Sequence, residues 1–146
     1  MILLVVHAAA VWFLVGLVAV VQGLVYPGLA ALGPSVPESV WVEHHDRHTR
    51  AMARVVTVPW AVQGVTCAVL LFARPPGVPF WLGAVAGVCG AVTVAVTVLV
   101  SVPCHRRLAS GFDAAVARRL VVTNGWRTAA WALGGVVAAV MLVMAA

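Results

Sequence analysis

Long apolar stretches alternate with short polar segments along the chain. A membrane-spanning helix needs about 20 consecutive, mostly apolar residues. Four stretches reach that length, at residues 2–25, 53–73, 79–102 and 128–146. The pattern therefore predicts an all-α protein: a four-transmembrane-helix bundle in which residues 1–146 form a single integral membrane domain.

The segments between the predicted spans contain residues that interrupt a helix. They read "YPGLAALGPSVP", "ARPPGVP" and "SVPCHRRLASGFD" and combine proline, glycine and charge. The letters "SVPE", from Ser35 to Glu38, are typical of a capping box, so a helix is expected to begin there and run into the second span. The stretch from Asp113 to Arg127 is expected to join the fourth span in the same way. Helices 2 and 4 should thus extend on one side and enclose a polar vestibule there.

The charged residues collect on that side. Four spans place both termini on one side of the membrane and the first and third connections on the other. The side with these two connections contains all four acids, every arginine except Arg74 and every histidine except His7. The positive-inside rule makes this side cytoplasmic, so both termini should lie outside a bacterial-type plasma membrane. With 9% charged residues and a net charge of +5, the arginines are interpreted as flanking the bilayer, and no nucleic-acid partner is expected.

Polar residues recur at helical spacing near this boundary. The stretch "VEHHDRHTR", residues 42–50, should place three histidines on one broad helix face, which continues into the membrane with further polar positions. These residues are His44, His45, His48, Pro59, Gln63 and Thr66.

The third span has its own polar stripe, which recurs every four residues and ends in a histidine: Thr93, Thr97, Ser101 and His105. The alternative explanation is that these hydroxyls bond to carbonyls of their own helix. Gln22, Asn124, Arg127 and Trp131 lie at the same level on the other two helices. Polar groups at membrane depth usually face the interior of a bundle or a wet cavity.

The sequence therefore predicts that at least three of the four clustered histidines share one cavity. Anchoring at the interface is the alternative for each of them taken singly. His7 is interpreted as interfacial or structural. Cys67, Cys89 and Cys104 lack CxxC spacing and are interpreted as packing residues.

Clustered histidines support either proton transfer or metal binding. His44, His45, His48 and His105 could together hold a copper or zinc ion, whereas no carboxylate is placed to complete an iron triad. Arg127 and Asn124 could hold an oxyanion, although Arg127 could equally be a snorkelling anchor. Neither HExxH, CxxCH nor a phosphate-cradling glycine loop is present, and no acid lies deep in a span, which disfavours proton-coupled transport.

Four segments carry a resemblance to a known family: "QGLVYPGLAALG", "HHDRHTR", "VPCHRRLASGFD" and "LVVTNGWRTAAW". They resemble the small four-helix membrane proteins of the anthrone oxygenase-like family over nearly the whole chain. The family's motifs match His45, His48 and Arg50; Pro103, His105, Arg106 and Leu108; and Asn124, Arg127 and Thr128. The usual Asn-Trp pair is interrupted, with Gly125 in place of tryptophan and Trp126 one position later.

The resemblance implies an enzyme that oxidises polycyclic aromatic anthrones to anthraquinones in polyketide biosynthesis without a familiar organic cofactor. We expect a membrane-embedded oxidoreductase that acts on a lipophilic polycyclic or polyketide-type substrate. The catalytic candidates are His45, His48, His105, Asn124 and Arg127. The substrate-binding candidates are Gln22, Tyr26, His44, Gln63 and Trp126.

Two alternatives belong to other functional classes. The same histidines could provide acid/base catalysis in a non-redox membrane cyclase or isomerase. The chain could also be a non-catalytic metal- or lipid-binding assembly protein that packs against its own copies as a homo-oligomer. Small residues suited to such contacts, or to packing within a single bundle, are Gly83, Gly87, Gly90, Gly134 and Gly135.

Overall fold

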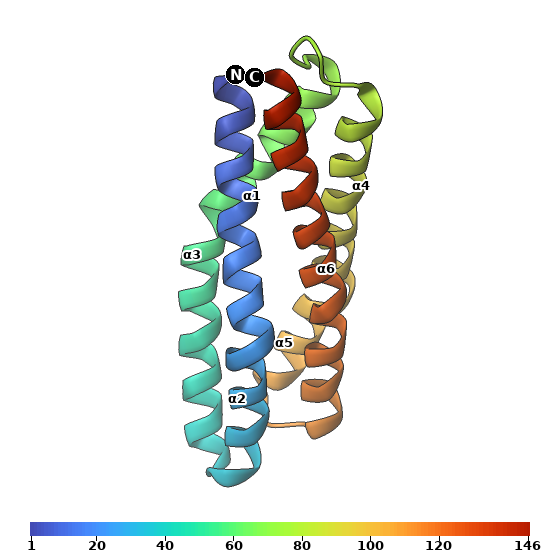
Figure 1. Cartoon of the computed structure of the whole chain (residues 1–146). Coiled ribbons are helices and arrows are strands. Elements are labelled where there is room, and N and C mark those ends of the chain that lie inside the picture. The colour runs from blue at the N-terminus through green and yellow to red at the C-terminus, as the bar shows by residue number, and fades with distance from the viewer.

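The computed structural model covers residues 1–146 and is an antiparallel bundle of helices without a strand (Figure 1). Its four continuous helical segments are each long and apolar enough to cross a membrane: Ile2–Ser35, Glu38–Phe72, Phe80–Leu108 and Ala114–Ala145. Both termini lie at one end of the bundle with the turn before α4, and the other two connections lie at the opposite end. The predicted all-α, four-helix membrane fold is confirmed.

The first helical segment is longer than predicted. It consists of α1 (Ile2–Val20), the π-helical turn η1 (Val21–Val25), α2 (Tyr26–Leu32) and the short 3₁₀ turn η2 (Gly33–Ser35). Pro27 lacks an N–H and would crowd a carbonyl of the preceding turn. The backbone N–H of Tyr26 instead bonds to the carbonyl of Val21, five residues earlier, so the hydrogen-bond register shifts just before the proline and the helix continues. The prediction that a connection begins at Tyr26 was wrong.

The third helical segment uses the same arrangement. It consists of α4 (Phe80–Val96), the π-helical turn η3 (Thr97–Ser101) and α5 (Val102–Leu108). The N–H of Val102 bonds to the carbonyl of Thr97, again five residues earlier, directly before Pro103. The predicted end near residue 102 was therefore too early, and all four helical segments, not only the second and fourth, continue past the predicted boundary.

The other two segments are single long helices, α3 (Glu38–Phe72) and α6 (Ala114–Ala145). At about 1.5 Å per residue, 35 residues of α3 span about 52 Å, well beyond a hydrocarbon core of about 30 Å. The side chain of Asp113 caps α6 by accepting bonds from the N–H groups of Ala115 and Val116. The predicted capping box before α3 does not form, because Ser35 donates its hydroxyl to the carbonyl of Ala31 instead.

The bundle core has three apolar layers. The largest lies toward the termini, a small one around Leu14, Val18 and Trp131 lies in the middle, and the third fills the opposite end. The buried members of this third layer are Val21, Tyr26, Leu29, Trp41, Cys104, Leu108, Ala117 and Leu120. The extended ends of the helices therefore pack on one another largely through apolar side chains.

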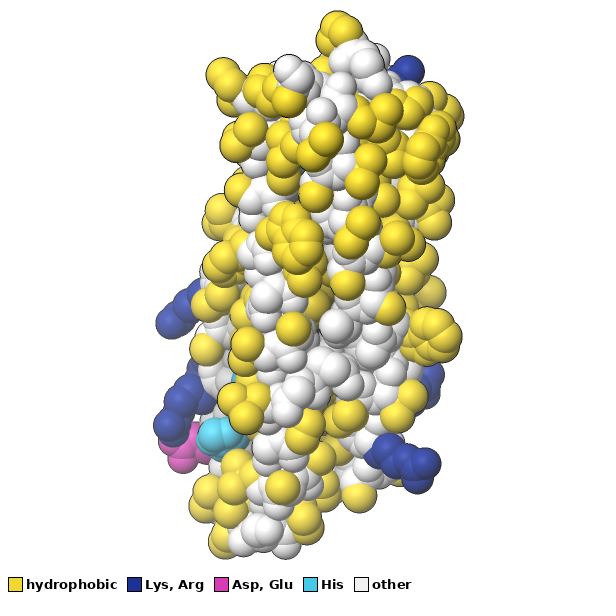
Figure 2. All heavy atoms as spheres, viewed as in Figure 1, with side chains coloured by type: hydrophobic (Ala, Val, Ile, Leu, Met, Phe, Trp, Pro, Cys, Tyr) yellow, Lys and Arg dark blue, Asp and Glu magenta, His cyan; other side chains and the backbone are white.

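The outer surface is mostly apolar. In Figure 2 hydrophobic side chains cover most of the visible face, and the charged side chains gather mainly in its lower half, away from the termini. This distribution is consistent with a lipid bilayer environment.

Glycines and cysteines belong to the helix contacts of this single chain. Gly134 on α6 lies against α4 and α1, where an added Cβ would contact Cys89 and Val11, and Gly135 lies against Trp12 of α1. Gly83 and Gly87 on α4 lie against Leu71 of α3, and Gly90 lies against Gln63. Close packing within one bundle thus accounts for these glycines, and homo-oligomerisation stays a prediction. Cys67, Cys89 and Cys104 are buried and unbonded, as expected of packing residues.

Candidate functional site

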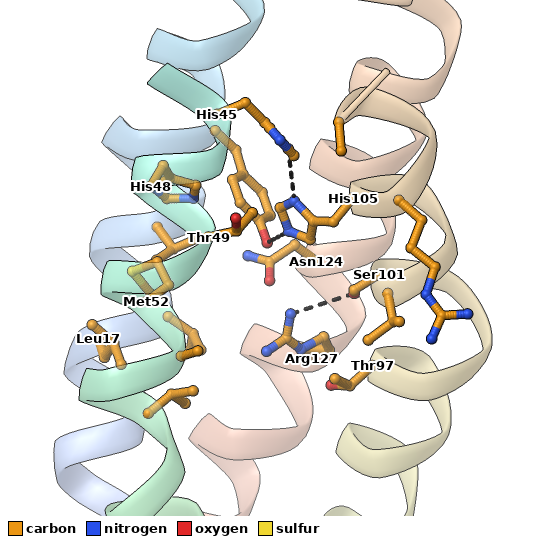
Figure 3. Close-up of a pocket in the computed structure, with 18 of the residues that line it drawn as sticks. Leu17, His45, His48, Thr49, Met52, Thr97, Ser101, His105, Asn124 and Arg127 are labelled. Atoms are coloured by element: carbon orange, nitrogen blue, oxygen red, sulfur yellow. Dashed lines mark hydrogen bonds between the residues drawn. The ribbon is translucent and has the colours of Figure 1, made fainter. Parts of the chain in front are cut away.

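A cavity of about 420 Å³ lies between the middle apolar layer and the third layer at the end opposite the termini (Figure 3). All four helical segments contribute to its wall, and this volume suits a small organic ligand. Its polar lining residues are Tyr26, His45, Asp46, His48, Thr49, Thr97, Ser101, His105, Arg106, Asn124 and Arg127. Its apolar lining includes Leu17, Val18, Val21, Met52, Ala53, Val56, Val102 and Ala109.

Three side chains from three segments form a hydrogen-bonded chain in this cavity. The hydroxyl of Tyr26 lies 3.2 Å from Nε2 of His105, and Nδ1 of the same imidazole lies 3.2 Å from Nε2 of His45. A neutral imidazole donates through one ring nitrogen and accepts through the other, so both ends of His105 are satisfied at once. If the ring tautomers switch, a proton is passed between Tyr26 and His45 through His105.

The π-helical turns bring this chain together. Tyr26 is the first residue after η1, and His105 lies one helical turn after η3. Each turn adds a residue to the local helical repeat and so rotates everything that follows it relative to the preceding helix. Tyr26 and His105 therefore reach the same point from different segments, and π turns of this kind are frequent at functional sites.

Trp41 holds His45 in place. Its ring stacks on that of His45, with centroids 5.5 Å apart at 30°, and its indole Nε1 donates a 2.9 Å hydrogen bond to the carbonyl of Leu108. Phe112 packs edge-on against the same indole. Trp41 was not predicted as a site residue, although its position one helical turn before His45 is a feature of the sequence that indicates such a role.

The four clustered histidines do not all lie in the cavity. His45, His48 and His105 line it, so the prediction that at least three share one cavity is confirmed. His44 is exposed and lies outside the lining, so its predicted role in substrate or metal binding is not supported by its position. The centroid of the His48 ring is 6.2 Å from that of His105.

These side chains do not form a metal centre. No group of three or more His, Cys, Asp or Glu side chains is close enough to hold a metal ion. Nε2 of His45 and Nδ1 of His105 face each other at hydrogen-bond distance, and Nε2 of His105 is bonded to Tyr26. The predicted site of four histidine ligands for copper or zinc is therefore not assembled.

Arg127 and Asn124 lie on the α6 side of the cavity, beyond His105. Arg127 donates a 3.4 Å hydrogen bond to the hydroxyl of Ser101, and its guanidinium lies 5.2 Å from the ring centroid of Trp131. Its Nε atom is buried without a partner. The Arg127 side chain therefore faces the cavity inside the bundle (Figure 3), which is not the position of a snorkelling anchor.

Asn124 is fully buried. Its Nδ2 donates a 2.8 Å hydrogen bond to Oε1 of Gln22 on η1, and its Oδ1 has no partner. Gln22 does not line the cavity, so it orients Asn124 instead of contacting a ligand as predicted. Asn124 and Arg127 thus offer a ligand one free acceptor and a cationic donor.

Two predicted substrate-binding residues lie elsewhere. Gln63 is buried in the middle of the bundle, where its Oε1 accepts a 3.4 Å bond from Nε1 of Trp131. Trp126 is 69% exposed on the outside of α6, because the helix directs it away from Asn124 and Arg127. Neither residue lines the cavity. His7, also distant, is buried against the hydroxyl of Thr66 at 2.8 Å, which fits a structural role and not an interfacial one.

The hydroxyl groups along the third helical segment bond to carbonyls of that segment, which was the alternative explanation for their regular spacing. Thr93, Thr97 and Ser101 each bond to a carbonyl of their own helical segment. Thr97 and Ser101 nevertheless line the cavity, and Ser101 also accepts the bond from Arg127. Thr49, Met52 and Arg106 also line the cavity, and none of them was predicted to bind substrate or to act in catalysis.

Comparison of this chain with protein families, with curated proteins and with solved structures gives no match. Its chemistry is therefore inferred from the cavity and from the resemblance carried by the sequence motifs. The cavity combines a proton-transfer chain, a buried cation and an amide acceptor with an apolar wall, which is the set that acid/base catalysis on an oily substrate requires.

Proposed function

We propose that this protein is a membrane-embedded oxidoreductase that oxidises a lipophilic polycyclic substrate of the anthrone type. The observation that carries the proposal is the Tyr26–His105–His45 chain, which faces the same cavity as Arg127. The sequence resemblance to anthrone oxygenase-like proteins supplies the substrate class. The apolar lining from Val18, Val21 and Met52 suits a flat hydrocarbon ring system.

The first step in this proposal is removal of a proton from the activated ring carbon of the anthrone. Tyr26 takes the proton at its phenol oxygen while its own proton passes to Nε2 of His105, and the Nδ1 proton of His105 passes to Nε2 of His45. The electrons of the broken C–H bond move onto the carbonyl oxygen, which becomes an anion. Arg127 stabilises this oxyanion, because a buried cation interacts strongly with charge that develops in an apolar site.

The oxidant is dioxygen. The carbanion donates electrons to dioxygen and forms a new C–O bond, the O–O bond breaks, and the second hydrogen on that carbon is lost. One anthrone and one dioxygen give one anthraquinone and one water, so atoms and electrons balance. The residues of the cavity bind, orient and deprotonate the substrate, and they hold the oxyanion until dioxygen reacts.

The second candidate is a non-redox cyclase or isomerase. The proton-transfer chain favours it, because Tyr26 and His45 lie on opposite sides of His105 and could remove and return a proton without any oxidant. A non-catalytic assembly protein would have no use for such a chain. Homo-oligomerisation is compatible with each of these proposals.

Product mass separates the candidates. The purified protein in lipid vesicles is incubated with anthrone in air and under argon, and the product is analysed by mass spectrometry. Oxidation adds one oxygen and removes two hydrogens, and it stops under argon. A product of unchanged mass would support the isomerase, and binding without any product would support the assembly protein.

We also propose that the cavity lies at the cytoplasmic face of a bacterial-type plasma membrane and that both termini lie outside. The support is the concentration of arginines at the cavity end, including Arg106, Arg107, Arg118 and Arg119. A reporter enzyme that is active only in the cytoplasm, fused after Ala146, should stay inactive. The same reporter inserted in the turn between Ala109 and Asp113 should be active.

A further inference from the structure

The cavity is closed along the axis of the bundle. Toward the termini, the middle apolar layer of Leu14, Val18 and Trp131 separates it from the rest of the core. Toward the opposite end, Trp41, Leu108 and their neighbours form the third apolar layer. Water therefore has no axial route to His105 from either end of the bundle.

The open side lies between α3 and the α4–α5 segment. These helices pack tightly near the turn that joins them, where Leu71 contacts Gly83 and Gly87. At the level of the cavity they stand on opposite sides of it (Figure 3), and both contribute residues that line the cavity and are also exposed on the outer surface. Ala53 on α3, Val102 and Arg106 on α5, and Ala109 just after α5 have both properties.

The rim of this opening is graded from apolar to charged. On the side toward the middle of the bundle it is formed by Ala53, Val56 and Val102, and the neighbouring outer surface carries exposed Val55, Val58, Val98 and Leu99. On the side toward the charged end it is formed by Asp46 and Arg106. A hydrocarbon core of about 30 Å accommodates about 20 residues of α3. Counted from Phe72 at the end of α3, these reach back to about Ala53, so the rim crosses the boundary between acyl chains and headgroups.

We propose that this opening is a lateral portal through which a membrane-dissolved amphiphile reaches the cavity directly from one leaflet. Its apolar body passes between Ala53 and Val102, and its oxygen-bearing end comes to lie beside Arg127 and Asn124. Arg106 at the charged side of the rim favours an amphiphile whose polar end is anionic or phenolic. The inference rests on the proposed function only in taking this cavity as the binding site, and its test requires no turnover.

A cysteine placed on the inner wall reports which phase reaches the cavity. Thr97→Cys is a small change at a residue that lines the cavity within the predicted third span. The protein in lipid vesicles is treated with a membrane-partitioning pyrene maleimide or with a charged, membrane-impermeant methanethiosulfonate. The unsubstituted chain, whose three cysteines are buried, gives the background. We expect the pyrene reagent to label Thr97→Cys and the charged reagent to leave it unmodified.

A matched pair of substitutions then tests the position of the portal. Ala53→Trp in the Thr97→Cys chain should abolish labelling by the pyrene reagent, because the indole would fill the rim. Ala51→Trp adds the same side chain to an exposed position on α3 that does not line the cavity, and labelling should persist. Labelling by the charged reagent, labelling by neither reagent, or equal labelling of the two tryptophan variants would each overturn the portal. If the labelling is as expected but the wild-type protein does not oxidise anthrone, the proposed function is refuted and the portal is not.

Discussion

The hydroxyl of Tyr26 lies 3.2 Å from Nε2 of His105, although 79 positions separate the two residues in the chain. Each follows a π-helical turn in its own segment, and each lies close to a proline: Tyr26 directly precedes Pro27, and His105 lies two residues after Pro103. This pairing makes His105 the centre of the proton-transfer chain, because its other nitrogen faces His45.

Tyr26→Phe should leave the bundle folded and slow anthrone oxidation by about 100-fold, at the lower end of what one acid/base group contributes. The phenyl ring retains the apolar packing of Tyr26 in the third layer, whereas Nε2 of His105 loses its partner. Initial rates in vesicles measure the effect, and the circular dichroism spectrum checks the fold. An unchanged rate would remove Tyr26 from the proton-transfer chain.

Arg127→Met should reduce kcat by about 100- to 1000-fold, the range for loss of one donor to a developing oxyanion. Methionine keeps much of the side-chain volume but removes the cation beside Ser101 and Trp131. Arg119→Met is the control on the same helix, because Arg119 is exposed and does not line the cavity. The two variants should therefore differ strongly in kcat, and similar values would contradict the role given to Arg127.

Gln22 and Asn124 should be energetically coupled. Asn124→Ala leaves Gln22 without the partner that lies 2.8 Å away, and Gln22→Ala leaves the buried Nδ2 of Asn124 short of one acceptor. Each single variant should lose about 1–3 kcal/mol of unfolding free energy, the cost of an unpaired buried polar group. The double variant should lose less than the sum of the two. Unfolding in detergent micelles measures all three, and strict additivity would show that the bond contributes nothing.

Gly33→Ala should destabilise the fold by about 1–3 kcal/mol, as overpacking typically does. A Cβ at Gly33 would clash with the ring of Phe112, which packs on Trp41 and so supports His45. Gly28→Ala is the matched control in α2, where an added Cβ meets nothing within 4 Å. Thermal unfolding should show a loss for Gly33→Ala and none for Gly28→Ala, and equal midpoints would contradict the predicted clash.

The bundle was predictable because four long apolar stretches leave little choice of fold. The helix ends were not, since Pro27 and Pro103 usually interrupt a helix and here follow π turns that let it continue. Those turns also rotate the residues beyond them, so periodicity counted from the start of a helix does not give the direction of Tyr26 or His105.

It was predictable from the sequence that all four helical segments contribute to one site, but not which residues of each segment lie in it. The spacing of His45 and His48 placed both in the cavity, but one-turn spacing also included His44, which faces outward. Gln63 and Trp126 were predicted to contact the substrate, and both lie outside the cavity for related reasons. Gln63 lies on the correct face but too deep, bonded to Trp131, and Trp126 lies at the correct depth but on the outer face of α6. Helical periodicity indicates the direction of a side chain around its helix but not its depth in the membrane. The position of the polar boundary indicates depth but not direction.

The central claim, that His105 acts on a membrane-dissolved substrate, is tested most directly by the rate of anthrone oxidation in vesicles by the wild-type, His105→Ala and His44→Ala proteins. Removal of His105 should abolish turnover, because both Tyr26 and His45 lose their partner, whereas removal of the exposed His44 should leave the rate unchanged. Equal rates for all three proteins, or equal losses in the two variants, would contradict it.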